Sequence, residues 1–241
     1  MNNTWKDGWF IFKKDFMLDR WYFIWNVLFM LYIALMISAM VNPHGEGTSI
    51  LNSMADFMFL TLIPTMGFYF SRRSFNYIKE DSYTRMLHYY RTFPIPNIAI
   101  MKGRVIQLII AMIFNAIIFY PVFYLFSRNA GGALHNAGQL GAFALTWTGY
   151  GLLINGAYIY LEFLNKGRKY LWISFVLLFS TGFLAFVVRW FGGNLLLFTL
   201  EQSVRYSLLS PLMWGALIVG GTCLALFCKI TLSKLGKRDL I

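Results

Sequence analysis

Residues 80–104 of this chain read EDSYTRMLHYYRTFPIPNIAIMKGR and lie between two long apolar segments. The stretch opens on two acidic residues and carries Arg91 near the end of a run without proline or glycine, an arrangement that suits a helix and its dipole. Pro94 and Pro96 follow, and each disfavours helical geometry in the residue before it. Asn97 can then cap a new helix. The pattern predicts a short polar helix, a proline corner and a return to the apolar part of the chain.

This predicted polar helix also carries many large apolar side chains. Its charged residues alone would indicate an ordinary solvated helix face. The aromatic and apolar side chains are too many for a helix with nothing to pack on, namely Tyr83, Met86, Leu87, Tyr89, Tyr90 and Phe93. We expect them to contact other cytoplasmic parts of the chain or another protein.

The composition indicates that the chain is embedded in a membrane. Of its 241 residues, 58% are hydrophobic and 13% are charged, whereas a soluble domain has about 45–50% apolar and about 25% charged residues. A membrane-crossing helix needs roughly 20 apolar residues. The sequence offers six such runs, at approximately 21–41, 51–70, 105–126, 140–161, 171–188 and 212–228. We therefore predict an all-α integral membrane protein in which residues 1–241 form a single transmembrane domain.

The basic residues are unequally shared between the two sides of the predicted spans. With six spans, 18 of the 21 lysines and arginines fall on the side of the termini and of the 80–104 loop. Basic segments favour the cytoplasm, where anionic lipid head groups attract them. The sequence thus predicts a multi-pass protein of the cell membrane with both termini cytoplasmic. We attribute the net charge of +11 to this placement beside lipid and not to nucleic acid. We expect no cleavable signal peptide, because the first apolar run is too long for one.

Residues 5–19 precede the first predicted span and have the spacing of an amphipathic helix. The aromatic residues Trp5, Trp9, Phe12 and Phe16 recur on one helix face, with lysines off that face. Such a helix is expected to lie in the membrane interface. The sequence leaves open whether it is a simple anchor or a lever joined to the first span.

Residues 191–210 stand out on the predicted external side. Glu201 and Arg205 make this segment too polar to span, and its leucines make it too apolar for a free loop. We expect one or two short helices that dip partway into the outer leaflet, with an amphipathic surface loop as the alternative. Asp56, near the same side, is expected to cap a helix or to lie at the interface.

The fourth and sixth predicted spans contain several glycines, namely Gly149, Gly151, Gly156, Gly215, Gly220 and Gly221. Small residues let helices approach closely in lipid. We expect close packing within the subunit, with a dimer interface as the alternative.

The order of these parts resembles the six-span permease subunits of type-2 ATP-binding-cassette (ABC) exporters over nearly the full chain. In that family a Glu opens the loop after the second span and a Thr follows four residues later. A Leu-Pro-Ile-Ser turn and a Gly-Lys pair then lead into the third span. Here these places hold Glu80, Thr84, the run FPIP at 93–96 and GR at 103–104. Phe for Leu, Pro for Ser and Arg for Lys are departures that preserve shape and charge.

The resemblance implies a dimer, made with a second copy or with a homologous permease. It also implies a separate cytoplasmic ABC ATPase that the helix after the second span contacts. This chain has no GxxxxGK[ST] phosphate loop, so ATP and Mg²⁺ are expected on that partner and no cofactor is expected here. Within the 77–104 coupling loop, the residues expected to contact the ATPase or to stiffen the corner are Glu80, Asp81, Thr84, Arg85, His88, Arg91, Phe93, Pro94 and Pro96.

The function expected from the sequence is therefore that of the transport subunit of an ATP-driven exporter. Uncharged span interiors with a few amides, Asn115 and Asn155, suit an amphipathic or hydrophobic cargo such as a peptide, an antimicrobial or a lipid-like molecule. A membrane sensor or immunity subunit that recruits an ATPase without transport is the alternative. An intramembrane enzyme is disfavoured, because Asp56 and Glu162 lie near opposite ends of different spans and the histidines are dispersed. No catalytic or metal site is expected.

Overall fold

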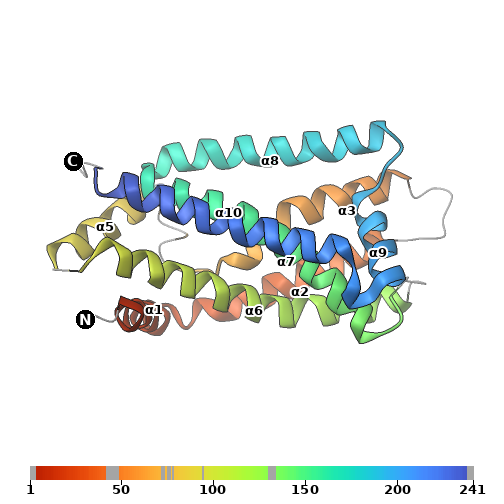
Figure 1. The fold of residues 1–241 in the computed structure, drawn as a ribbon, viewed down its shortest axis with the longest axis horizontal. Helices are drawn as coiled ribbons and strands as arrows, with labels where there is room; N and C mark the ends of the chain where they lie inside the picture. Colours follow the sequence, from red (N-terminus) through yellow and green to blue (C-terminus); the bar gives the residue numbers. More distant parts are fainter. Residues whose placement is uncertain are drawn as a thin grey trace.

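The apolar runs of the chain form long helices that lie along one common axis (Figure 1). The computed structural model describes residues 4–41, 49–71, 74, 77, 79–93, 95–129 and 134–237, and the regular structure of these residues is helical. In chain order the elements are α1 (Thr4–Asp19), α2 (Tyr22–Met40), α3 (Ser49–Leu62), the 3₁₀ turn η1 (Ile63–Gly67), α5 (Ser82–Thr92), α6 (Asn97–Asn129), α7 (Ala137–Leu164), α8 (Gly167–Trp190), α9 (Leu195–Tyr206), η2 (Ser207–Leu209) and α10 (Pro211–Leu235).

Among the described residues, four helices are long and apolar enough to cross a membrane, namely α2, α6, α8 and α10. Helices α3 and α7 coincide with the two other predicted spans but do not meet this criterion. Helix α3 has only 14 residues and gives way to the 3₁₀ turn that contains Pro64, which lacks a backbone donor. Helix α7 has 28 residues, but its many glycine, threonine and tyrosine positions lower its hydropathy. The six-span prediction is confirmed only in its coarser form, an all-helical chain with several candidate spans.

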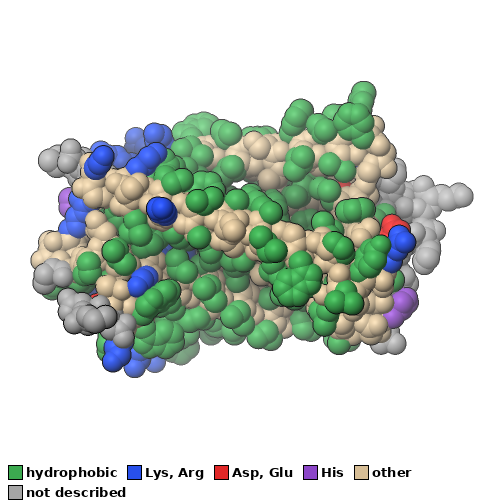
Figure 2. Space-filling view, in the orientation of Figure 1, with side chains coloured by type: hydrophobic (Ala, Val, Ile, Leu, Met, Phe, Trp, Pro, Cys, Tyr) green, Lys and Arg blue, Asp and Glu red, His purple; other side chains and the backbone are tan. Residues whose placement is uncertain are grey.

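Helix α1, helix α5 and the end of α10 lie at the same end of the bundle, which we call the α5 end (Figure 1). Helix α9 lies at the opposite end. Lys and Arg side chains gather at the α5 end on the face shown in Figure 2, and the flank between the ends is largely hydrophobic. This arrangement agrees with the one-sided distribution of basic residues along the sequence.

Helix α1 lies across the start of α6 and is seen nearly end-on in Figure 1. Two glycines allow the contact, since a Cβ atom on Gly8 would lie 3.0 Å from the backbone nitrogen of Gly103. Lys102 Nζ also donates a hydrogen bond of 2.6 Å to Thr4 Oγ1. The predicted interfacial helix is therefore a helix fixed against the bundle.

The predicted aromatic stripe of α1 is divided between two environments. Trp5 and Trp9 are exposed, whereas Phe12 is buried and Phe16 is half-buried. Phe16 lies 5.5 Å, ring centre to ring centre, from Phe23 of α2. The four aromatic residues therefore do not share one exposed face, because Phe12 is buried and Phe16 is half-buried.

Helix α3 breaks inside the bundle, and two buried amides satisfy the carbonyl groups that the break leaves without partners. Asn155 Nδ2 donates to the carbonyl oxygen of Pro64 at 2.9 Å. Asn115 Nδ2 donates to the carbonyl oxygens of Met66 and Phe68 at 2.9 and 3.0 Å. Irregular backbone at membrane depth is tolerated only where its polar groups find partners. These amides thus stabilise the break.

An acidic residue of α3 anchors α9. The carboxylate of Asp56 is buried and accepts hydrogen bonds from the backbone nitrogens of Leu195 and Leu196, at 2.9 and 2.7 Å. These are the first residues of α9, where the helix dipole favours an anion. The structure confirms a helix within residues 191–210 and the helix-capping interpretation of Asp56.

Helices α7 and α10 pack closely through glycines. A Cβ atom on Gly220 would collide with the carbonyl oxygen of Gly149, and one on Gly156 would press against α10. A Cβ atom on Gly215 or Gly221 would meet no neighbour within 4 Å. Packing within the subunit is therefore confirmed for Gly149, Gly156 and Gly220.

Candidate functional site

Helix α5 has one buried and one exposed face. The buried face consists of Tyr83, Thr84, Leu87 and Tyr90. The helix begins one residue after Asp81, whose left-handed backbone conformation (φ 45°, ψ 49°) interrupts the helix that was predicted from Glu80. Of the large side chains predicted to need a contact, Tyr83, Leu87 and Tyr90 pack within the chain, whereas Tyr89 and Phe93 are exposed.

Most residues expected to contact an ATPase form an exposed surface at the α5 end, which we call the α5 surface: Glu80, Arg85, His88, Arg91, Phe93 and Pro96. Arg85 Nη1 lies 3.3 Å from Glu80 Oε2 within this surface. Thr84 does not contribute to it, because its side chain is buried. Pro94 lies outside the described residues.

Two residues of this expected set also form hydrogen bonds to other helices of the same chain. Asp81 Oδ1 accepts a hydrogen bond of 2.8 Å from the backbone nitrogen of Gly167, at the start of α8. Arg91 Nη2 donates a hydrogen bond of 2.6 Å to the carbonyl oxygen of Leu235, at the end of α10. An acid at a helix N-terminus and a cation at a C-terminus both suit the helix dipole. Asp81 and Arg91 therefore connect α5 to two long helices.

A third contact joins α5 to α1. The Tyr90 hydroxyl donates to both carboxylate oxygens of Asp15, at 3.2 and 3.3 Å. The Lys14 ammonium lies 4.2 Å from the ring centre of Tyr89. Helix α5 thus has polar contacts with α1, α8 and α10, which together place it as a junction at this end of the bundle.

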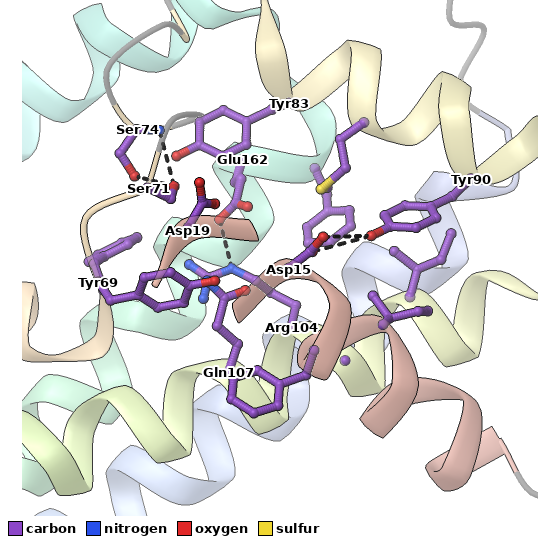
Figure 3. A pocket seen from close by; sticks show the side chains of 17 residues that line it. Asp15, Asp19, Tyr69, Ser71, Ser74, Tyr83, Tyr90, Arg104, Gln107 and Glu162 are labelled. Atoms are coloured by element: carbon purple, nitrogen blue, oxygen red, sulfur yellow. Dashed lines mark hydrogen bonds and ion pairs between the residues drawn. The ribbon is translucent and has the colours of Figure 1, made fainter. Parts of the chain in front are cut away.

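Beneath α5 lies a small, largely enclosed cavity of about 30 Å³, which we call the inner pocket. A water molecule needs about 10–15 Å³ of such volume, so the inner pocket has room for water. Its polar lining comes from α1, α5, α6, α7 and the segment after η1, as Figure 3 shows: Asp15, Asp19, Ser71, Ser74, Tyr83, Tyr90, Arg104, Gln107 and Glu162.

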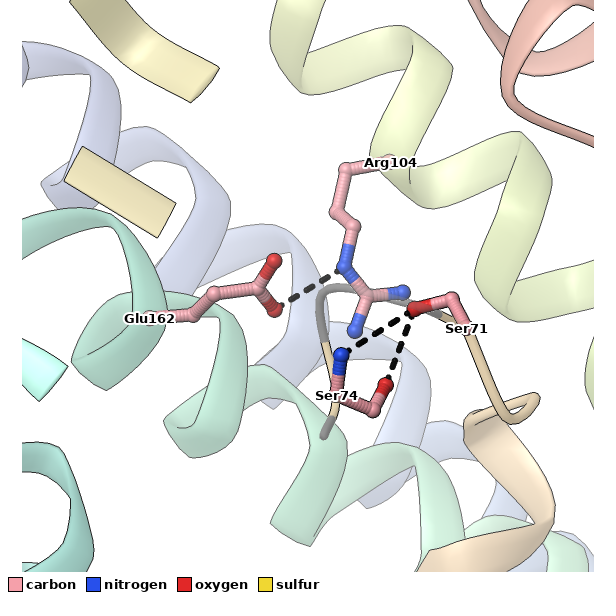
Figure 4. Close-up of polar contacts among 4 residues, drawn as sticks. All are labelled: Ser71, Ser74, Arg104 and Glu162. Atoms are coloured by element: carbon pink, nitrogen blue, oxygen red, sulfur yellow. Dashed lines mark hydrogen bonds and ion pairs between the residues drawn. The ribbon is translucent and has the colours of Figure 1, made fainter. Parts of the chain in front are cut away.

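A buried ion pair lies at the centre of the inner pocket. Arg104 Nε of α6 lies 3.0 Å from Glu162 Oε2 of α7, and the two side chains are 7% and 4% exposed. The guanidinium points between Glu162 and Ser71 (Figure 4), and its Nη1 has no hydrogen-bond partner among the described residues. The pair ties α6 to α7, and removal of either partner would leave an uncompensated buried charge.

A larger and partly open cavity of about 370 Å³ adjoins the inner pocket, and we call it the outer cavity. Phe68, Tyr69, Ser74 and Tyr83 line both cavities. The outer cavity lies among α2, the broken segment around η1, α5, α7 and α8. Its volume falls within the range of about 300–1,000 Å³ that is typical of small-molecule sites.

Tyrosine side chains from three parts of the chain meet at the outer cavity. The ring of Tyr170 lies 5.4, 5.6 and 6.3 Å from the rings of Tyr77, Tyr83 and Tyr158, measured between ring centres. Phe68 lies 5.4 Å from Tyr158. Burial, reinforced by the negative charge of Glu162, raises the pKa of Tyr83, and burial also raises the pKa of Tyr77. These two phenols therefore stay neutral at physiological pH.

Sequence reasoning missed both the ion pair and the tyrosine cluster. Arg104 was assigned to the start of the third span and Glu162 to the end of the fourth, which places them on the same side. Charged residues within spans tend to pair with one another, and this signal could have found the ion pair. The tyrosines have no common sequence pattern because they come from separate segments.

Among the described residues, no three His, Cys, Asp or Glu side chains are placed to hold a metal ion. Comparisons of the chain with protein-family models, with curated proteins and with solved structures found no match.

Proposed function

We propose that this chain is the membrane subunit of an ATP-driven exporter of the type-2 ABC kind, and that a separate cytoplasmic subunit hydrolyses ATP. The observation that carries the proposal is the double character of α5. Its α5 surface is charged, aromatic and exposed, while its ends are bonded to α1, α8 and α10. A helix with these two properties can receive a force from a partner and transmit it to the spans.

In this proposal the ATPase contacts the α5 surface, chiefly Glu80, Arg85 and His88. A displacement of α5 reaches α8 through Asp81 and α10 through Arg91. The Arg104–Glu162 pair ties α6 to α7, and the glycine contacts tie α7 to α10, so these three helices move as one unit relative to α8.

The same proposal assigns six crossings to the chain, with α3 and η1 together as the second and α7 as the fourth. Both termini and the α5 surface then face the cytoplasm, where the ATPase is. The outer cavity serves as the binding site for an amphipathic or hydrophobic cargo, because aromatic rings and hydroxyl groups line it. A second copy or a homologous permease, together with lipid, covers the exposed apolar flank of α8.

The test is to co-express the chain with an ABC ATPase encoded in a neighbouring reading frame and to reconstitute the complex in vesicles. The proposal expects a stable complex and ATP-dependent movement of an amphipathic cargo into vesicles whose ATPase faces outward. A stable complex without transport would favour the sensor or immunity alternative. Failure of the two proteins to associate would contradict both.

A further inference from the structure

Two hydroxyl groups in the wall of the outer cavity use their protons in hydrogen bonds within the chain. Thr65 Oγ1 donates to the carbonyl oxygen of Leu62 at 2.6 Å. Ser174 Oγ donates to the carbonyl oxygen of Tyr170 at 2.9 Å. A hydroxyl has one proton and two lone pairs, so the remaining capacity of both groups is to accept. At these two positions the wall therefore favours a ligand that donates hydrogen bonds or carries positive charge.

The amide of Asn26 adds another acceptor, and the network around it fixes its orientation. Asn115 uses its Nδ2 to bond the carbonyl oxygens of Met66 and Phe68, so its Oδ1 must be the atom that accepts. Asn26 Nδ2 is the donor to that oxygen. Asn26 also lines the outer cavity, and its Oδ1 is left as an acceptor.

The aromatic rings of the wall add a second attraction for a cation. Ring faces carry negative electrostatic potential and attract cations within about 6 Å of the ring centre. Phe68 already shows this property, since the Arg104 guanidinium lies 5.3 Å from its ring centre. None of the described side chains that line the outer cavity is charged. Acceptor oxygens and ring faces thus line a cavity whose described wall residues carry no charge.

We propose that the outer cavity binds an organic cation, namely an ammonium group with apolar or aromatic substituents. The ammonium lies against the rings of Tyr158 and Tyr170 and near the oxygens of Ser174 and Asn26. Its substituents contact the apolar wall on the α2 side, where Phe29 lies. Only the description of this molecule as a cargo rests on the proposed transport function; the binding itself needs no ATPase.

The experiment measures binding of radiolabelled benzyltrimethylammonium to the purified full chain in maltoside micelles, with empty micelles subtracted. Neopentylbenzene, its uncharged isostere, and benzenesulfonate, an anion, serve as competitors. We expect saturable binding of the cation. The isostere should compete more weakly than unlabelled cation by more than roughly 2-fold, since each of the two cation–π contacts supplies roughly 2- to 30-fold. Benzenesulfonate should not compete. Absence of saturable cation binding, or equal competition by all three compounds, would overturn the proposal.

Added lipid separates two sources of the cation. If the head group of phosphatidylcholine is the natural occupant, this lipid lowers the apparent affinity for the probe, whereas phosphatidylglycerol does not. If the natural ligand is a free organic cation, neither lipid competes. Both outcomes support a cation site, and competition by phosphatidylglycerol alone contradicts it.

Two matched pairs of variants localise the site. Tyr158→Leu removes a ring and should weaken cation binding by roughly 2- to 30-fold, while Tyr158→Phe keeps the ring and should retain most of it. Ser174→Ala should weaken binding, whereas Ser180→Ala should not, although Ser180 makes the same type of bond on α8 (to Val176, 2.8 Å) outside the cavity. Wild-type affinity in a folded Tyr158→Leu variant would refute the site. Cation binding without ATP-driven transport would support this inference and contradict the proposed function. ATP-driven transport without cation binding would support the proposed function and contradict this inference.

Discussion

Asp81 and Gly167 are joined by a hydrogen bond of 2.8 Å, from the backbone nitrogen of Gly167 to Asp81 Oδ1, across 86 residues of chain. A side chain cannot replace the hydrogen of Gly167, because a Cβ atom there would collide with the carbonyl oxygen of Tyr77. Asp81 has a positive φ of 45°, a conformation that Asp, Asn and Gly adopt more readily than other residues. The connection between α5 and α8 thus depends on a glycine at position 167 and on an aspartate at position 81.

The first prediction concerns this connection. Asp81→Ala removes the carboxylate that accepts the hydrogen bond. It also leaves a residue without a polar side chain in the left-handed conformation, so the variant should lose about 1–3 kcal/mol of local stability. Asp81→Asn keeps an acceptor oxygen and tolerates the conformation. Hydrogen–deuterium exchange in the first turn of α8 should accelerate in the Ala variant and change little in the Asn variant. Equal exchange in wild type and Asp81→Ala would show that the bond does not hold α8.

A second prediction addresses the buried pair Arg104–Glu162. Glu162→Leu leaves the buried guanidinium without its counter-charge and should destabilise the chain by about 3–5 kcal/mol. The double variant Arg104→Met, Glu162→Leu removes both charges and should recover most of that loss. Thermal unfolding in detergent measures both effects. A double variant as unstable as Glu162→Leu would contradict the account of the pair.

The third prediction concerns the anchoring of α9 by Asp56. Asp56→Ala removes two charge-assisted hydrogen bonds to Leu195 and Leu196, each worth about 1.5–3 kcal/mol. Backbone amides at the start of α9 should then exchange faster and the segment should become sensitive to protease. Glu201→Gln alters an exposed acid on the same helix and serves as the control. If both variants behave alike, Asp56 is not the anchor.

Helix packing between α7 and α10 provides a fourth prediction. Gly220→Ala places a methyl group against the carbonyl oxygen of Gly149 and should destabilise the chain by about 1–3 kcal/mol through overpacking. Gly221→Ala adds the same methyl group one residue later, where there is open space. The control should therefore melt at or slightly above the wild-type temperature. Similar melting of the two variants would place the close contact elsewhere.

The helices were largely predictable because long apolar runs and proline corners are local signals. The predicted helix after the second span appears as α5, and Pro96 precedes α6 as expected. The amides of Ala99 and Ile100 donate to the Pro96 carbonyl, so Asn97 does not act as the cap. The break in α3 was not predicted. Its cost is offset by Asn115 and Asn155 from other helices, and a single segment carries no sign of such distant partners.

The candidate site was predictable only as a surface. The residues expected to contact an ATPase included Arg85 and His88, which are exposed, but also Thr84, which came from the family resemblance and is buried. It also could not show that Asp81 and Arg91 bond helices 86 and 144 residues away in sequence. The outer cavity was missed for the same reason, since its tyrosines come together only when α5, α7 and α8 pack.

The fifth prediction tests the central claim, that a partner ATPase moves the spans through the α5 surface. The exposed pair between Arg85 and Glu80 is worth only about 0–1 kcal/mol, so Arg85→Glu should leave the melting temperature unchanged. It should nevertheless abolish or strongly reduce ATP-driven transport, because it reverses a charge on the surface that the ATPase contacts. Lys13→Glu, an exposed charge reversal on α1, is the matched control.

The most direct measurement is the ratio of cargo transported to ATP hydrolysed by the reconstituted complex. The account predicts that Arg85→Glu lowers this ratio at least about tenfold, equivalent to about 1.4 kcal/mol of lost coupling, while Lys13→Glu leaves it unchanged. A wild-type ratio in the Arg85→Glu complex would contradict the claim that α5 transmits the movement.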